Sequence, residues 1–112
     1  MTEPRLATGM LVSALIRRIE AEGGSAMVLA HGDDVAGSLL ILLANRGRLS
    51  AIVERTWRIE GGHGFERVGP ADPNQPGVVA DYVARRRRSD PDLWAIEIDH
   101  PEAERIAGEL LL

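Results

Sequence analysis

Four consecutive arginines, Arg85 to Arg88, are the most concentrated group of chemically capable side chains in this sequence. Guanidinium groups bind phosphates and carboxylates through paired hydrogen bonds, so the run could hold a phosphate ligand, a nucleic acid or an acidic protein surface. Consecutive helical residues point about 100° apart, which prevents all four from facing one ligand. Cations also suit a helix carboxyl end, and Asp81, Asp90 and Asp92 lie close enough in sequence to neutralise some of them. The run therefore predicts either a solvated, internally paired helix end or a binding surface.

Carboxylates form a second cluster directly after the arginines. Its members are Asp90, Asp92, Glu97 and Asp99. Carboxylate oxygens are ligands for Mg²⁺, and the pattern partly matches the Pro-Asp and Glu-x-Lys residues of metal-dependent nucleases. The spacing is shorter than in those enzymes, and the sequence has no lysine to polarise a phosphate or a water. We therefore interpret Asp90-Pro91 as the stop of a helix, and Glu97 and Asp99 as the solvent face of a strand.

The remaining polar residues form no recognisable catalytic pattern. His31, His63 and His100 lack the short spacings that fix a metal site, although Asp33 and Asp34 beside His31 would suit a small acid–base site. The serines have no Gly-x-Ser-x-Gly motif, and the chain has no cysteine to act as a nucleophile. The sequence therefore predicts no catalytic residue, no metal site and no cofactor, and it gives no support to an enzyme.

The composition indicates one small domain that folds around its own core. The chain has 112 residues, of which 45% are hydrophobic, and its formal net charge is -4. A chain of this size buries about two-thirds of its unfolded surface, so a core forms without disulfides. The negative charge and the few aromatic residues disfavour nucleic acid as a partner. The longest apolar run, Leu39 to Ala44, is too short to span a membrane, and Arg17 and Arg18 follow only a short apolar segment, so we expect a cytoplasmic protein.

Hydrophobic periodicity predicts a helix and three strands in the first half of the chain. Leu11, Leu15 and Ile19 form the apolar stripe of an amphipathic helix over Met10–Glu22. Strands are predicted at Ala26–His31, Ser38–Ala44 and Leu49–Trp57. The second of these strands is apolar on both alternating faces, so we expect it at the centre of the sheet with cover on both sides. A turn cluster follows it, which predicts an antiparallel hairpin with the third strand.

The second half of the chain predicts another hairpin, a helix, a strand and a final helix. The expected elements are hairpin strands at Trp57–Glu60 and Phe65–Val68, a helix at Gly77–Arg88, a strand at Leu93–Asp99 and a helix from Pro101. Asp72 or Asn74 could cap the first of these helices. The order α-β-β-β-β-α-β-α predicts a single α+β domain over residues 1–112, with a mainly antiparallel sheet of about five strands and three covering helices.

Three segments carry a resemblance to a known family. They are Leu11–Arg18, Gly32-Asp33 with Ala36-Gly37, and Asp90-Pro91-Asp92-Leu93-Trp94-Ala95-Ile96-Glu97. Together they resemble domain of unknown function 1491, a family of short bacterial proteins that are mostly alphaproteobacterial. The likeness covers nearly the whole chain, and the arginine-rich helix followed by Asp-Pro-Asp-Leu-Trp is its most specific part. The resemblance implies a single-domain intracellular protein, and it implies no activity, cofactor or catalytic residue.

Three kinds of function stay open at this point. The first is a non-enzymatic protein-interaction module whose partner is another protein or a second copy of the chain. Its surface would include an open sheet edge or the following residues: Arg85, Arg86, Arg87, Arg88, Asp90, Asp92 and Trp57. The alternative is a small-ligand or phosphate-binding protein, which could be an enzyme, using the arginine-rich helix end. Nucleic-acid binding is the third, kept only because of the basic run.

Overall fold

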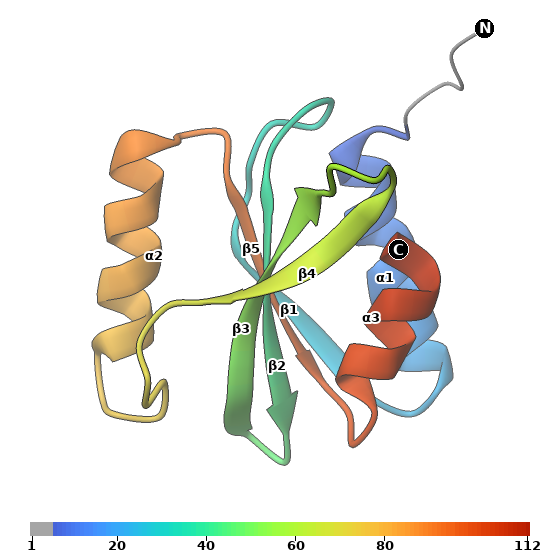
Figure 1. Cartoon of the computed structure of the whole chain (residues 1–112). Coiled ribbons are helices and arrows are strands. Elements are labelled where there is room, and N and C mark those ends of the chain that lie inside the picture. Colours follow the sequence, from blue (N-terminus) through green and yellow to red (C-terminus); the bar gives the residue numbers. More distant parts are fainter. Residues whose placement is uncertain (1–5) are drawn as a thin grey trace, which may run out of the picture.

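A five-stranded sheet, with its strands in the order β1-β5-β2-β3-β4, carries three helices on its two faces (Figure 1). The computed structural model describes residues 6–112. The helices are α1 (Thr8–Ala21), α2 (Val78–Ser89) and α3 (Ala103–Leu111). The strands are β1 (Ser25–Ala30), β2 (Leu39–Asn45), β3 (Arg48–Trp57), β4 (His63–Val68) and β5 (Trp94–Asp99). The predicted α+β class and the predicted order of elements are confirmed.

Three of the four strand pairs are antiparallel and one is parallel. β5 enters the sheet between β1 and β2, antiparallel to β1 and parallel to β2. The parallel pair arises because the chain crosses one face of the sheet through α2 before β5 begins, and such a crossover is what parallel strands require. The sheet is therefore mixed. β2 lies at its centre with Leu40, Ile41 and Leu42 fully buried, as its two-sided apolar pattern predicts.

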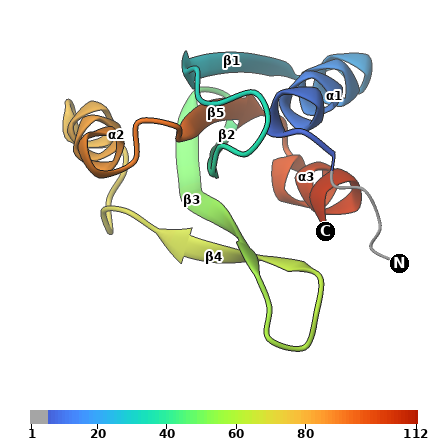
Figure 2. The same cartoon turned by 90° about the horizontal axis from the view of Figure 1, so that it is seen from above.

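Helices α1 and α3 lie side by side on one face of the sheet (Figure 2). Leu15 and Ile19 from α1 and Ile106 from α3 are fully buried there, together with Ile96 and Ile98 of β5. The spacing of four residues between the two α1 side chains puts both on the face that meets the sheet, as the apolar stripe predicts. Within residues 6–112, no helix is long and apolar enough to cross a membrane.

Helix α2 covers part of the opposite face by itself. Tyr82 is the one buried residue among the twelve of this helix, and it packs in a smaller cluster with Leu40, Leu42 and Ile52. Val79 and Val83 add partly buried contacts. Because so few apolar residues of α2 reach the sheet, polar contacts have to contribute to its docking.

The start of α2 differs from the prediction. The residue before the helix is Gly77, in a left-handed conformation with φ of 81°, and no side chain caps the helix. The side chain of Asn74 instead bonds the backbone of Leu49: its amide donates to the carbonyl at 2.8 Å, and its oxygen accepts the N–H at 2.9 Å. Asp72 accepts the N–H of Asn74 at 3.1 Å. Both predicted caps therefore shape the loop that ties α2 to β3.

The second hairpin is a continuation of β3 rather than a separate unit. β3 runs to Trp57 and pairs with β4 from Trp57 opposite His63 to Ile52 opposite Val68. The predicted strand over residues 57–60 is wrong, because Arg58 onward forms the turn. Residues 58–62 project away from the body of the molecule at the end of the β3–β4 ribbon (Figure 2).

Candidate functional site

Arg86 is an internal docking residue of α2 rather than a free ligand-binding cation. Its guanidinium donates to the hydroxyl of Tyr82 at 2.8 Å and to the carboxylate of Glu54 on β3 at 2.9 Å. Desolvation alone would lower the pKa of Arg86, but these two hydrogen bonds outweigh it and the pKa is raised. The arginine is therefore held in its charged form against the sheet.

The other three arginines point to different surroundings. Arg87 donates to the backbone carbonyls of His31 and Pro91, at 3.1 Å each, and its Nε is buried without a hydrogen-bond partner. Arg85 lies over the ring of Tyr82, with its guanidinium carbon 5.5 Å from the ring centroid. Arg88 is exposed. The four arginines do not converge on one ligand, as the 100° spacing of helical residues predicts.

The acids expected to neutralise the arginine run do not do so. In the part of the chain that the structure describes, no ion pair involves Asp81, Asp90 or Asp92, and the partner of Arg86 is the distant Glu54. Asp90 ends the helix and accepts the N–H of Asp92 at 3.2 Å. The predicted helix stop at Asp90 is therefore confirmed, and the predicted local charge pairing is wrong.

Two of the resemblance segments meet in space at one end of the sheet. The Asp92 carbonyl accepts the N–H of Asp33 at 3.0 Å, and the Trp94 indole N–H donates to the Asp33 carbonyl at 2.8 Å. A Cβ on Gly32 would lie 2.2 Å from the Asp92 carbonyl oxygen, and one on Gly37 would lie 2.3 Å from it. Only glycine permits this approach. The segments that carry the resemblance therefore build a backbone junction rather than a set of reactive side chains.

Trp57 lies at the end of β3 with 57% of its surface exposed. Its ring contacts the ring of His63 across the hairpin, with centroids 4.0 Å apart. Trp57 is the last residue of β3, on the β3–β4 ribbon, whereas the arginine run belongs to the end of α2, a helix that lies on the other side of the sheet from α1 and α3 (Figure 1). The structure therefore does not bring Trp57 together with the other residues of the predicted surface.

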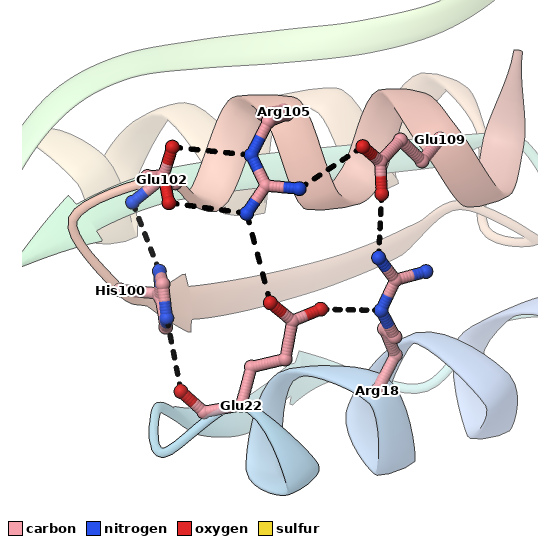
Figure 3. A network of polar contacts seen from close by, with 6 residues as sticks. All are labelled: Arg18, Glu22, His100, Glu102, Arg105 and Glu109. Atoms are coloured by element: carbon pink, nitrogen blue, oxygen red, sulfur yellow. Dashed lines mark hydrogen bonds and ion pairs between the residues drawn. The ribbon is translucent and has the colours of Figure 1, made fainter.

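Six charged or polar residues join α1 to α3 in one network (Figure 3). They are Arg18, Glu22, His100, Glu102, Arg105 and Glu109. Arg105 of α3 forms ion pairs with Glu102 and Glu109, and its guanidinium lies 3.6 Å from the carboxylate of Glu22 at the end of α1. Arg18 of α1 forms ion pairs with Glu22 and Glu109. Hydrogen bonds from the arginines lower the pKa of all three glutamates. The network is a clamp between two helices.

The histidines and carboxylates do not assemble a metal site. Within residues 6–112, no group of three or more histidine and carboxylate side chains is placed to hold an ion. Asp99 uses both oxygens to accept the backbone N–H groups of Arg46 and Gly47, at 2.9 and 2.8 Å. Glu97 is half-buried on the sheet face, where burial raises its pKa and the charge of Asp99 raises it further. Asp99 therefore anchors a turn.

Two shallow hollows lie on either side of the segment Gly69-Pro70. The larger, about 530 Å³, is bordered by β3, β4 and Glu104, and the smaller, about 360 Å³, by Val78, Tyr82 and Arg85. Both are open to solvent. The smaller one contains a single residue of the arginine run, so neither hollow gathers the cations that a phosphate pocket needs.

The outer edge of β1 is the most apolar exposed surface of the sheet. β1 ends the strand order, and β5 is its one neighbour in the part of the chain that the structure describes. Met27, Val28 and Leu29 are consecutive and have 57%, 39% and 41% of their surface exposed. No pattern in the sequence identified β1 as an open edge of the sheet. β1 lies at the edge because β5 enters the sheet between β1 and β2, and no local sequence pattern predicts that strand order.

The fold and the junction define a small α+β domain built on a mixed five-stranded sheet. The chain belongs to the family described as "Protein of unknown function (DUF1491)", which matches residues 6–108. The expected family is confirmed.

Solved structures of similar proteins share this fold. A crystal structure of a DUF1491 family protein from Caulobacter crescentus CB15 has 29% identity and a TM-score of 0.72, over 91% of this chain and 94% of that one. The solution structure of protein Atu0922 from A. tumefaciens has 31% identity and a TM-score of 0.67, over 88% and 89%. Comparison with curated proteins finds no match.

Proposed function

We propose that this protein is a non-enzymatic cytoplasmic protein-interaction module that binds a strand of its partner along the outer edge of β1. The supporting observation is the exposed apolar run Met27, Val28 and Leu29 on a strand with one open edge. An added strand satisfies the open backbone groups of such an edge, and apolar side chains on both faces add contact area. The Trp57 hairpin and the arginine-rich helix end are separate surfaces that this proposal does not use.

Phosphate or nucleic-acid binding by the arginine run has weaker support. Arg86 and Arg87 are partly buried and hydrogen-bonded to groups of the protein itself, which leaves Arg85 and Arg88 as the exposed arginines of the run. Two separated cations and a net charge of -4 make a poor electrostatic footprint for a polyanion. A protein partner at the β1 edge needs no such footprint.

Site-specific photo-crosslinking in cells tests the proposal. A benzophenone amino acid replaces Met27 in one variant and Ile59, which is fully exposed on the distant hairpin turn, in a matched control. We expect a protease-sensitive, nuclease-resistant adduct of defined mass from position 27 and none from position 59. The adduct is also expected to disappear when Leu29→Arg is added, because a charge on the edge opposes strand pairing. Equal labelling from both positions, or no adduct from position 27, would rule the proposal out.

A further inference from the structure

The β1 edge supports a more specific statement about its occupant, which rests on the function proposed above. We propose that a second copy of this chain occupies the edge. The two β1 strands pair antiparallel about a two-fold axis at Met27, so that the two sheets join into one sheet of ten strands. Three features of the edge support this: its charge, its register and the apolar surface on its flanks.

The charge pattern of β1 suits pairing with itself. A two-fold axis places the residue on the axis opposite its own counterpart, so a charge at that position would meet a like charge. Ser25–Ala30 contains no charged residue and no proline. The opposite edge of the sheet, β4, carries Glu66 and Arg67, which are devices that block edge pairing. The protein therefore protects one edge and leaves the other without charge.

The register follows from the shape of the strand. β1 pairs regularly with β5 from Ser25 to Val28, and a bulge interrupts the pairing between Val28 and Ala30. An axis at Met27 places Ala26 opposite Val28 of the second copy, and Ser25 opposite its Leu29. This register pairs Ala26, Met27 and Val28 within the regular part of the strand, and it brings Met27, the most exposed of the three apolar residues, against its own counterpart.

Exposed apolar side chains on segments that adjoin β1 would add to the area that strand pairing buries. Stable dimers bury about 1,200–2,000 Å² in total, more than two short strands provide. The loop after β1 is bonded to the start of α1, since the N–H of Thr8 donates to the carbonyl of Val35 at 3.3 Å. Of the nine large hydrophobic side chains exposed in residues 6–112, six lie on β1, this loop or the adjoining end of α1. They are Leu6, Met10, Met27, Val28, Leu29 and Val35.

The free outer side of β1 is visible from above the sheet (Figure 2). β1 forms one margin of the molecule, α1 adjoins one end of the strand, and α2 lies beyond its other end. A second copy can therefore approach along the strand, and the two α1 helices would flank the new pair. Helix α1 packs on the sheet face that Ala26 also faces, so the contact extends the existing core.

Sedimentation equilibrium of the purified chain tests the inference, with Met27→Lys compared against Ile59→Lys. We expect a monomer–dimer equilibrium for the wild type and for Ile59→Lys, and a dissociation constant at least about tenfold higher for Met27→Lys, a loss of ~1.4 kcal/mol. Both positions are exposed, so both variants should keep the wild-type melting curve at concentrations low enough for the wild type to be monomeric. A wild type that stays monomeric at about 1 mM, where even a weak dimer of millimolar affinity is populated, would overturn the inference, as would a dimer that Met27→Lys leaves intact.

Disulfide trapping fixes the register, because the chain has no cysteine of its own. Met27→Cys should form a covalent dimer under mild oxidation, since residues at the axis lie directly opposite each other and within disulfide range. Ser25→Cys, two residues from the axis, should not. If the purified chain is monomeric and the photo-crosslinker at position 27 captures a different protein, the dimer proposal is wrong and the proposed function stands. If the purified chain is monomeric and position 27 gives no crosslinked adduct in cells, both the dimer proposal and the proposed function are wrong.

Discussion

The guanidinium of Arg86 and the carboxylate of Glu54 lie 2.9 Å apart between α2 and β3, residues that are 32 positions apart in sequence. Both side chains are largely withdrawn from solvent, with 27% and 19% of their side-chain surface exposed. Since α2 buries only Tyr82, this ion pair is an important polar attachment of the helix to the sheet, and the hydroxyl of Tyr82 accepts a second hydrogen bond from the same guanidinium.

Replacing Arg86 by alanine should destabilise the protein, whereas replacing its neighbour Arg88 should not. Loss of hydrogen bonds from a charged group costs about 1.5–3 kcal/mol, and partial exposure reduces this to about 1 kcal/mol. Arg88 is exposed and provides the matched control. Urea unfolding of both variants, of Glu54→Ala and of the double variant measures the coupling. Additive effects of the Arg86 and Glu54 changes would contradict the assigned contact.

Gly32→Ala should be among the most damaging single changes in the chain. Its Cβ would lie 2.2 Å from the Asp92 carbonyl oxygen, so the junction between the loop and β5 would have to open. We expect a loss of about 2 kcal/mol or more in the free energy of unfolding. Gly108→Ala is the control, because the nearest atom to its Cβ is 3.8 Å away within a helix, where alanine is favoured by about 1 kcal/mol. Equal melting temperatures for Gly32→Ala and the wild type would contradict the close approach of Gly32 to the Asp92 carbonyl.

Glu97→Gln should stabilise the protein near neutral pH and have little effect in acid. Burial raises the pKa of Glu97, so the folded state takes up a proton at a higher pH than the unfolded chain does. Folding therefore carries a charge penalty above the raised pKa, and the penalty vanishes below the unfolded value of about 4.3. We expect a gain of less than about 1 kcal/mol at neutral pH, since the group is partly exposed. A gain that persists unchanged in acid would contradict this origin.

The clamp between α1 and α3 should weaken in acid. The pKa values of Glu22, Glu102 and Glu109 are lowered by hydrogen bonds from Arg18 and Arg105, so these carboxylates stabilise the fold above their unfolded pKa of about 4.3. This stability is lost as the pH falls through their lowered folded values. Melting temperatures followed from neutral pH downward should therefore drop.

Arg105→Gln tests which group holds the clamp together. The variant should lower the melting temperature at neutral pH and flatten its fall in acid, because Arg105 contacts all three glutamates. High salt should reduce the difference between variant and wild type, since the charges are exposed to solvent. An acid-induced fall as steep in the variant as in the wild type would place the relevant carboxylates elsewhere.

Local patterns in the sequence were sufficient to predict most helices and strands. They were insufficient to predict which of these elements are neighbours in the fold. Periodicity predicts α1 and the central position of β2, because the spacing of apolar residues shows whether one face or both faces of an element are buried. The partner of Arg86 could not be predicted, since Glu54 approaches it only through the α2 crossover. The position of β5 between β1 and β2 has the same cause: strand order depends on the path of the chain and not on the composition of the strand.

The insertion of β5 also has a consequence for the time at which the protein can fold. β1 leaves the ribosome well before its hydrogen-bonded neighbour, Trp94–Asp99, which follows it only after three further strands and a helix. Until then the β2–β3–β4 hairpins can form locally, whereas β1 lacks its native neighbour β5 and both of its edges stay unpaired. Closing the sheet is therefore a late, long-range event, and such non-local pairing is slow. A nascent chain that stalls before residue 94 would expose an unpaired β1 to any neighbouring chain.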